Sequence, residues 1–362
     1  MPRIIGHDRA VSTLQTAVAA KRLHHAWIFS GPRGVGKCTL AIELARVLLD
    51  KRVTEASLNS DDGGFMKTDG GPDSKLLLGG SHPDFHMIHR GLAAHSSNPQ
   101  LRDRKQTNIP IDLLRETMLG GRTSDNRVHD AAAYRTSVMG SAKVFVVDEA
   151  ERLDLPGQNA LLKTLEEPPP ATYIFLITSR PERLLPTILS RCQHLRLAPL
   201  TDTQMLEWFN QSEIDATPNV LDTAMTFAQG SPGMASLAIT RDITKWIESV
   251  ESILNALDDG LWDGRGADVF IDIVESWAES VVKDNPKASK DAANRDGIEI
   301  LLRVLASHLR RSLRTTDNRS IMVEHCWRVD RIAQAETQIA AGLNLKHVLE
   351  ALVAEWSCPV VH

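Results

Sequence analysis

Apolar residues follow two different patterns along the first fifty positions. Residues 10–20 place apolar side chains at helical spacing, whereas Ala26–Ser30 is a short continuous apolar run of the kind found in a buried strand. From Cys38 to Asp50 the helical spacing returns. The pattern predicts a strand, a glycine-rich loop and a helix, which is the first half of an α/β unit.

Three further apolar runs predict buried strands: Phe85–Ile88, Val144–Val147 and Tyr173–Ile177. Helical patterns begin near Ile111 and cover residues 159–165, and the second of these ends at the prolines 168–170. Strands that are apolar throughout suit a sheet covered on both faces. Alternation of such strands with helices predicts an α/β domain with a parallel sheet.

No strand pattern follows residue 199, and amphipathic helical patterns continue to the C-terminus. Glycine and proline interrupt them at 230–233, and a polar loop is expected at 284–296. We therefore expect three parts: an α/β domain over 1–198, a small helical lid over 199–240 and an all-α domain over 241–362. Within the first part, residues 54–142 are expected to be an insertion, with loops at 59–81 and about 90–108.

The composition is that of an ordinary folded protein of 362 residues, 42% apolar and 24% charged, with a net charge of −5. This charge argues against a protein that coats nucleic acid through bulk positive charge. The acidity is concentrated in residues 201–300, which carry 7 basic and 19 acidic residues, or −12. Four separated cysteines and the absence of a signal-like or membrane-spanning apolar run lead us to expect a soluble cytoplasmic protein.

The loop after the first predicted strand carries the clearest chemical motif. Residues 31–38, Gly-Pro-Arg-Gly-Val-Gly-Lys-Cys, fit the phosphate-binding pattern Gly-x4-Gly-Lys-[Ser/Thr] at all but the last position. In this motif the loop backbone and the helix N-terminus hold phosphate oxygens, and the lysine reaches the β- and γ-phosphates. The candidate nucleotide-binding residues here are Gly31, Gly34, Gly36, Lys37, Cys38 and Thr39.

Two later strands end in residues that suit the same site. Asp148 and Glu149 directly follow the apolar run 144–147. In a P-loop NTPase an acid at this position holds Mg²⁺ and the next polarises the attacking water, so these roles are expected for Asp148 and Glu149. Thr178 ends the next strand, and its hydroxyl is placed either to bond a γ-phosphate or simply to cap the strand end. These two interpretations of Thr178 stay open.

Two features argue against ATP hydrolysis. Cys38 stands where a Ser or Thr hydroxyl ligates Mg²⁺, and a soft thiol is a poor ligand for this hard cation. Thr39 does not replace it, because one step along a helix rotates the side chain by ~100°. In addition, residues 201–240 contain no Lys, Arg or His that could reach a γ-phosphate, and Met234 follows Gly233.

Three other groups of residues each have two interpretations. Arg191 in Ser190-Arg191-Cys192 is either an arginine finger for a neighbouring molecule's site or half of a surface ion pair. The residues His82, His86 and His89 are interpreted as ordinary strand and loop histidines rather than as metal ligands, and no metal is predicted. Arginines at 310, 311 and 314 are expected to form a solvated helix face rather than a contact with nucleic acid or a partner.

Five segments together resemble the clamp-loader branch of the AAA+ family: Arg22–Ala26, Gly31–Cys38, Asp148–Glu151, Asn159–Pro169 and Ser190–Cys192. The resemblance is dense over residues 3–53 and 143–235 and patchy over 54–142. It implies a P-loop AAA+ domain followed by a lid and a helical collar. It also implies a pentameric ring, joined through the collars, that opens a sliding clamp and loads it on primed DNA in the replisome.

The family also implies a role for this chain within the ring. Its stator member lacks ATP turnover and provides the arginine of Ser-Arg-Cys, here Arg191, to the ATP site of a neighbouring motor subunit. Cys38 and Met234 fit that role, since hydrolysing members carry Ser or Thr and an arginine at these positions. Many relatives hold zinc through four cysteines after the first helix, but residues 51–81 have none, so no zinc is predicted.

Three functions are therefore compared. The first is a non-hydrolysing interaction subunit that needs no cofactor, although ATP or ADP bound without turnover stays open because Lys37, Asp148 and Glu149 are present. The second is an ATP-hydrolysing AAA+ motor subunit or remodelling ATPase. The third, a P-loop kinase, is disfavoured by the long helical C-terminal half. The absence of a cation in 201–240 favours the first.

Overall fold

The computed structural model describes residues 4–50, 52, 72–139, 142–258 and 266–356. The chain forms two compact units, Met1–Ile214 with Gln229–Met234 and Asp215–Ala228 with Ala235–His362. The expected lid, 199–240, contributes residues to both units, and the three-part division itself stays a prediction.

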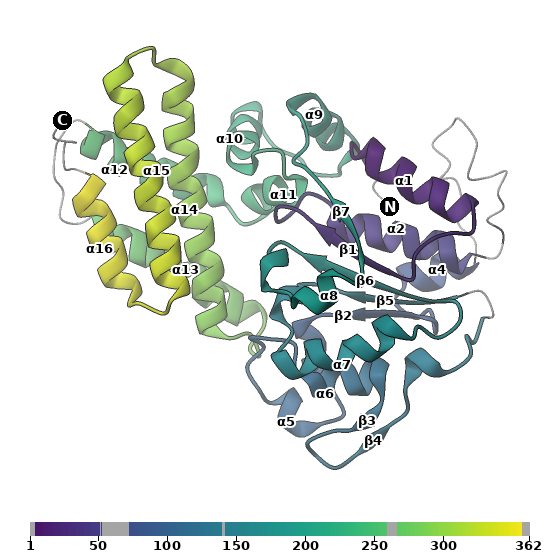
Figure 1. Ribbon diagram of the computed structural model, residues 1–362. Coiled ribbons are helices and arrows are strands. Elements are labelled where there is room, and N and C mark those ends of the chain that lie inside the picture. Colours follow the sequence, from purple (N-terminus) through teal and green to yellow (C-terminus); the bar gives the residue numbers. More distant parts are fainter. Residues whose placement is uncertain (1–3, 51, 53–71, 140–141, 259–265, 357–362) are drawn as a thin grey trace. The chain divides into compact units, whose positions relative to one another are not determined.

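A five-stranded sheet is the centre of the first unit (Figure 1). Its strands are β1 (Ala26–Ser30), β2 (Phe85–Ile88), β5 (Lys143–Val147), β6 (Thr172–Thr178) and β7 (Gln193–Arg196). They lie in the order β2-β5-β6-β1-β7, and every pairing is parallel. The prediction of an α/β domain with a parallel sheet is confirmed.

Helices cover both faces of this sheet, which explains why its central strands are apolar throughout. The α-helices of the unit are α1 (Asp8–Ala19), α2 (Lys37–Leu49), α4 (Pro72–Leu78), α5 (Pro99–Arg102), α6 (Ile111–Leu114), α7 (Leu155–Glu166), α8 (Pro186–Leu189) and α9 (Asp202–Gln211). Residues of α1, α2 and α4 share one core with Phe29, Val146 and Phe175 of the sheet. Residues of α6, α7 and α8 share a second core with alternate strand positions.

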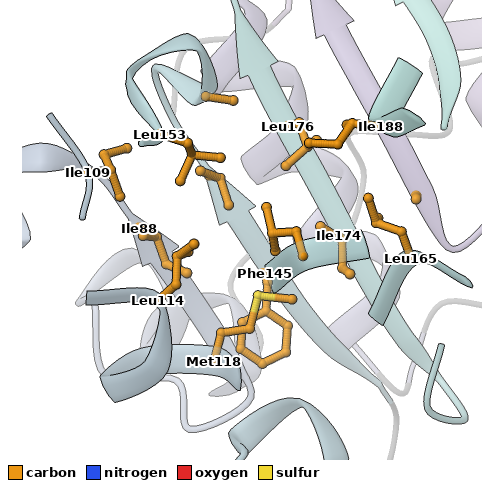
Figure 2. Close-up of a cluster of buried hydrophobic side chains, with 14 of the residues drawn as sticks. Ile88, Ile109, Leu114, Met118, Phe145, Leu153, Leu165, Ile174, Leu176 and Ile188 are labelled. Carbon is orange, nitrogen blue, oxygen red and sulfur yellow. The ribbon is translucent and has the colours of Figure 1, made fainter. Parts of the chain in front are cut away.

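Figure 2 shows this second core, in which the side chains of several elements meet on one face of the sheet. Phe145 and Ile174 come from adjacent strands, Leu165 from the end of α7 and Ile188 from α8. All four are buried. The C-terminal end of α7 and the short helix α8 are thus fixed against the same sheet.

The sequence pattern missed several elements. The edge strand β7 pairs only with β1 and is largely exposed, so its sequence is half polar and shows no continuous apolar run. Part of the loop expected at 59–81 is helix α4, while 53–71 lie outside the described residues. The segment expected as a polar loop, about 90–108, contains the short helices η2 (Arg90–His95) and α5. A small hairpin, β3 (Gly121–Arg122) with β4 (Val128–His129), was also not predicted.

The second unit is helical, as predicted. It contains α10 (Pro218–Ala228), most of α11 (Pro232–Thr240), α12 (Ile243–Asp258), α13 (Gly266–Asp284), α14 (Lys290–Thr315), α15 (Arg319–Ala340) and α16 (Leu345–Trp356). The long helices α13, α14, α15 and α16 lie side by side (Figure 1). The loop expected at 284–296 is shorter, because Ser289 caps α14 by accepting a hydrogen bond from the Ala292 amide, so the helix starts at Lys290.

A charged group lies inside this helical unit. The Arg328 side chain is only 3% exposed and pairs with Asp258 Oδ1 at 2.5 Å and Glu324 Oε1 at 2.7 Å. The Trp356 indole donates to the same Asp258 oxygen, and the Arg328 guanidinium lies 5.2 Å from the Trp356 ring centroid. Burial opposes ionisation of Asp258, but hydrogen bonds from His308 and Trp356 and the charge of Arg328 outweigh it and lower the pKa of this carboxyl. The network joins the ends of α12 and α16 to α15.

Replacing Arg328 with Met is expected to destabilise the helical unit, because it leaves a partly buried carboxylate without its main cation. Loss of one partner of a buried pair typically costs about 3–5 kcal/mol, and we expect the lower end of that range, since Asp258 keeps His308 and Trp356. Urea denaturation measures the change. Arg311→Met is the matched control: Arg311 pairs with Glu251 on the surface, and such pairs contribute ~0–1 kcal/mol. Equal losses in the two variants would contradict the expectation.

Candidate functional site

The phosphate-binding loop lies between β1 and α2, as the sequence predicted. Gly31, Gly34 and Gly36 have φ angles of 144°, 81° and 104°, which side-chain-bearing residues rarely adopt. Gly36 is the N-cap of α2, so the free amide groups of the first helical turn begin at Lys37. The backbone therefore has the form of an anion cradle at a helix N-terminus.

The Lys37 ammonium is bonded within the loop itself. It donates to the carbonyls of Gly31 and Pro32, both at 2.7 Å, and to Ser179 Oγ at 3.0 Å. An ammonium has three donors, so this set uses all of them. Lys37 is 7% exposed, and burial, only partly offset by Glu151 and Asp148, lowers its pKa to about 8. Lys37 must release some of these bonds before it can bind a phosphate.

Cys38 and Thr39 begin α2 directly after Lys37. Burial, together with the charge of Asp148, raises the pKa of the Cys38 thiol to about 12. The side chain is therefore a neutral thiol at physiological pH. A neutral sulfur offers Mg²⁺ neither the charge nor the oxygen that this cation prefers. Thr39 is half-buried on the same helix turn.

The acidic pair predicted at the end of β5 lies in a charged environment. Asp148 Oδ1 accepts a hydrogen bond from the Glu149 amide, and burial raises the pKa of Asp148. Glu149 has a left-handed backbone, with φ of 52°. Its two carboxylate oxygens are each 3.0 Å from an arginine nitrogen, Oε1 from Arg152 and Oε2 from Arg90. Both carboxylate oxygens of Glu149 are therefore already paired, and the two arginines restrict how this group could orient a water molecule.

Thr178 lies beside the loop because β6 pairs with β1, which places Ser30 opposite Thr178. It is buried, and its Oγ1 accepts a hydrogen bond from the Arg180 amide. The next residue, Ser179, receives a hydrogen bond from Lys37 and donates its amide to Glu151 Oε1 at 3.3 Å. The structure thus gathers the ends of β1, β5 and β6 around Lys37.

The loop also contacts the segment that begins α11. The Gly233 amide donates to the Gly34 carbonyl at 2.8 Å. A Cβ atom built on Gly34 would lie 2.9 Å from the Met234 nitrogen, so the two backbones leave no space for a side chain. Met234 itself is 4% exposed. The residue after Gly233 is therefore a buried, apolar methionine whose backbone lies against the loop.

Arg191 lies apart from this loop. It lies two residues after the end of α8 and pairs with Glu166 of α7, with 2.6 Å between Nη2 and Oε1. Its Nη1 donates to the Thr187 carbonyl at 2.9 Å. The side chain is 35% exposed. Within the described structure its partners all belong to α7, α8 and their ends, so Arg191 does not serve the loop of its own chain.

Two of the three histidines in residues 82–89 contact neighbouring groups of the fold. His86 stacks on Phe145 with 4.7 Å between ring centroids, and His82 Nδ1 accepts a hydrogen bond from the Asp84 amide. Among the described residues no group of three or more His, Cys, Asp or Glu is arranged to hold a metal ion. In the same described part of the chain, no helix is both long and apolar enough for a membrane span.

Sequence reasoning missed several residues of the site. Arg90 and Arg152 hold Glu149, and Ser179 holds Lys37. His7 donates through Nε2 to the Val35 carbonyl at 2.8 Å, since a carbonyl can only accept. None of these residues belongs to a spacing motif, and only Ser179, which follows Thr178 at a strand end, had a position that pointed to the site.

Comparisons with known proteins show the family to which this chain belongs. Residues 6–201 match the family described as DNA polymerase III, delta subunit. The chain is 27% identical to DNA polymerase III subunit delta' of Escherichia coli over 302 residues, which is 82% of this chain and 80% of that protein. It is 30% identical to the delta' subunit of Pseudomonas aeruginosa, over 58% of this chain and 53% of that protein.

The chain is also 32% identical to DNA polymerase III subunit gamma/tau of Mycobacterium tuberculosis, over 54% of this chain but only 28% of that longer protein. The family match covers more than half of the chain, and the strand, loop and helix order described above lies within it. The chain therefore belongs to the DNA polymerase III delta subunit family and is a subunit of the clamp-loader type that acts in DNA replication.

Proposed function

We propose that this chain is the non-motor, or stator, subunit of a bacterial DNA polymerase III clamp loader. In this role it joins gamma/tau motor subunits and a delta subunit through its helical residues 241–362. The complex loads a sliding clamp on primed DNA in the cytoplasm. The chain provides Arg191 in trans to a neighbouring ATP site and leaves hydrolysis to its neighbours.

The observation that carries the non-hydrolysing role is the chemistry of Cys38. Mg²⁺ bridges the phosphates during phosphoryl transfer and is held in P-loop proteins by a hydroxyl at this position. Here the group is a thiol whose pKa lies at about 12. The site therefore lacks the oxygen ligand on which the metal, and through it the reaction, depends.

Three contacts support the same conclusion. Glu149, the candidate residue for polarising water, is held between Arg90 and Arg152. Lys37 has all three of its donors bonded to protein acceptors. Met234 is buried, at the position where the family resemblance implies an arginine in hydrolysing members. Binding of ATP or ADP without turnover is compatible with these contacts, and no cofactor is needed for the proposed role.

Arg191 is suited to act on a neighbouring molecule. Its guanidinium is about one-third exposed and keeps unbonded N–H groups, and its partners Glu166 and Thr187 lie outside the loop. An arginine that enters another subunit's site stabilises the charge on the transferring phosphoryl group. The surface position of Arg191 supports this use in trans.

The alternative is an ATP-hydrolysing AAA+ motor subunit or remodelling ATPase. Its support is that Lys37, Asp148 and Glu149 are present and that Thr178 lies beside the loop. This alternative requires Mg²⁺ to be held without a hydroxyl at position 38. A direct assay of turnover separates the two functions.

The isolated protein is expected to show negligible ATP turnover, far below the ~1–100 s⁻¹ common among enzymes. Cys38→Thr is expected to tighten binding of magnesium-ATP, since it adds a hydroxyl ligand, but not to restore turnover while Glu149 stays paired. Calorimetric titration with and without EDTA, beside a coupled ATPase assay, measures both. Cys326→Ser is the control, because this thiol is exposed. Turnover in the common range by the unaltered protein would refute the proposal.

Arg191→Ala is expected to leave assembly intact but to lower ATP hydrolysis by the complex reconstituted with gamma/tau and delta subunits. A missing arginine finger costs ~10³-fold or more at the site it serves, which appears as a partial loss where several sites are active. Arg183→Ala, at an exposed arginine on the neighbouring turn, is the control. An Arg191→Ala complex with unchanged hydrolysis would rule out the finger.

Lys37→Met is expected to change the pH dependence of stability. The folded pKa of about 8 lies below the ordinary value of 10.5, so between these pH values the unfolded chain binds more protons than the folded one. The native protein should therefore gain stability relative to Lys37→Met as pH rises from 8 to 10.5, by on the order of 2 kcal/mol. Urea denaturation of both proteins at pH 7.5 and pH 10 measures this difference. A constant difference would show that the Lys37 pKa is not lowered.

A further inference from the structure

The surroundings of Arg191 form a small supporting network that the proposed function leaves unexplained. The Arg191 guanidinium is held on two sides: Nη2 by Glu166 Oε1 at 2.6 Å and Nη1 by the Thr187 carbonyl at 2.9 Å. A guanidinium has five N–H donors in a fixed plane. Two contacts to different nitrogens therefore fix the orientation of that plane.

This arrangement orients the arginine without covering it. The described structure gives no partner to the Arg191 Nε–H, and Nη2 has a second hydrogen beyond the one that Glu166 accepts; Nη1 also lies 3.5 Å from Ser190 Oγ. Because the side chain stays 35% exposed, these remaining donors are accessible to an incoming anion. Glu166 uses only Oε1 in the pair. The carboxylate thus acts as a support for Arg191 rather than as a cover over it.

The two elements that bring Glu166 and Arg191 together are rigidly joined. Gln158 of α7 is buried; its Oε1 accepts from the Leu185 amide at 2.9 Å and its amide nitrogen donates to the Arg183 carbonyl at 3.4 Å. Leu165, next to Glu166, and Ile188 of α8 lie in one core, as Figure 2 shows. The separation of Glu166 and Arg191 is therefore set by the fold and not only by their own attraction.

The end of α7 has a further anchor. His25, which precedes β1, donates through Nε2 to the Leu165 carbonyl at 2.9 Å, since a carbonyl can only accept. The last carbonyls of a helix lack partners within the helix, so this bond satisfies one of them. His25 thereby ties the residue before Glu166 to the start of the strand that leads into the phosphate-binding loop.

We propose that Glu166 is a positioning residue for Arg191 and presents the guanidinium, already oriented, to the anionic phosphate of a neighbouring subunit. The inference rests on the proposed function of Arg191. A long arginine side chain loses much rotamer freedom when it is fixed. Because Glu166 and the Thr187 carbonyl fix it in the free subunit, less of that loss accompanies engagement of the phosphate.

The test compares Glu166→Gln, Glu167→Gln and Arg191→Ala in the reconstituted clamp-loader complex. Glu167→Gln is a matched control, because it removes the same charge from an adjacent exposed carboxylate for which the described residues give no ion pair. Size-exclusion chromatography checks assembly. Glu166→Gln is expected to lower turnover about three- to ten-fold at the site served by Arg191, with an unchanged KM for ATP. Glu167→Gln should match the unaltered complex.

A double variant completes the design. If Glu166 acts only through Arg191, adding Glu166→Gln to Arg191→Ala will lower turnover no further. Three results would overturn this inference and leave the finger role in place. The first is that the losses of turnover in the two single variants add up in the double variant. The others are equal effects of Glu166→Gln and Glu167→Gln, and unchanged or raised turnover in Glu166→Gln while Arg191→Ala is impaired. Unchanged turnover in Arg191→Ala would instead overturn the proposed function, and this inference with it.

Discussion

Burial of one parallel sheet on both faces determines the arrangement of everything else in the first unit. Parallel strands all end at the same edge of the sheet. Because β1, β5 and β6 are adjacent in pairs, the loop at Gly31–Lys37, the acids after Val147 and Thr178 come together at that edge. The two hydrophobic cores, one on each face, hold this edge in place. The geometry of the candidate site is thus a consequence of how the strands are ordered.

At that edge, the charged groups that would bind a nucleotide and its metal are already paired with other groups of the protein. Lys37 bonds two loop carbonyls and Ser179, and Glu149 bonds two arginines. Binding a phosphate therefore exchanges existing hydrogen bonds for new ones. This exchange yields less binding free energy than forming hydrogen bonds with donors that have no acceptor in the free protein. The neutral thiol of Cys38 removes the metal ligand that could make the exchange favourable. These contacts suit the proposed function, in which the subunit assembles but does not hydrolyse ATP.

The same sheet also positions the surface that carries Arg191. Its second core holds both the end of α7 and α8, and Gln158 joins α7 to the chain just before α8. Arg191 and Glu166 meet on this rigid base. Since these residues are partly exposed, their pairing adds little to stability. In the proposed function, the pairing matters because it sets the direction in which the arginine points.

The sequence by itself determined the strands β1, β2, β5 and β6, the phosphate-binding loop, the helical second half and the family. These depend on local signals: continuous apolar runs, glycines that must adopt positive φ, and residue types at fixed spacing. It did not reveal β7, an edge strand with a half-polar sequence, or the helix start at Lys290, which is set by a serine cap. Only the tertiary structure decided what surrounds Glu149, Lys37 and Arg191. Arg90 is 59 residues from Glu149, Ser179 is 142 from Lys37 and Glu166 is 25 from Arg191. Such partners meet because strand order and core packing place them together, and no local pattern in the chain records that.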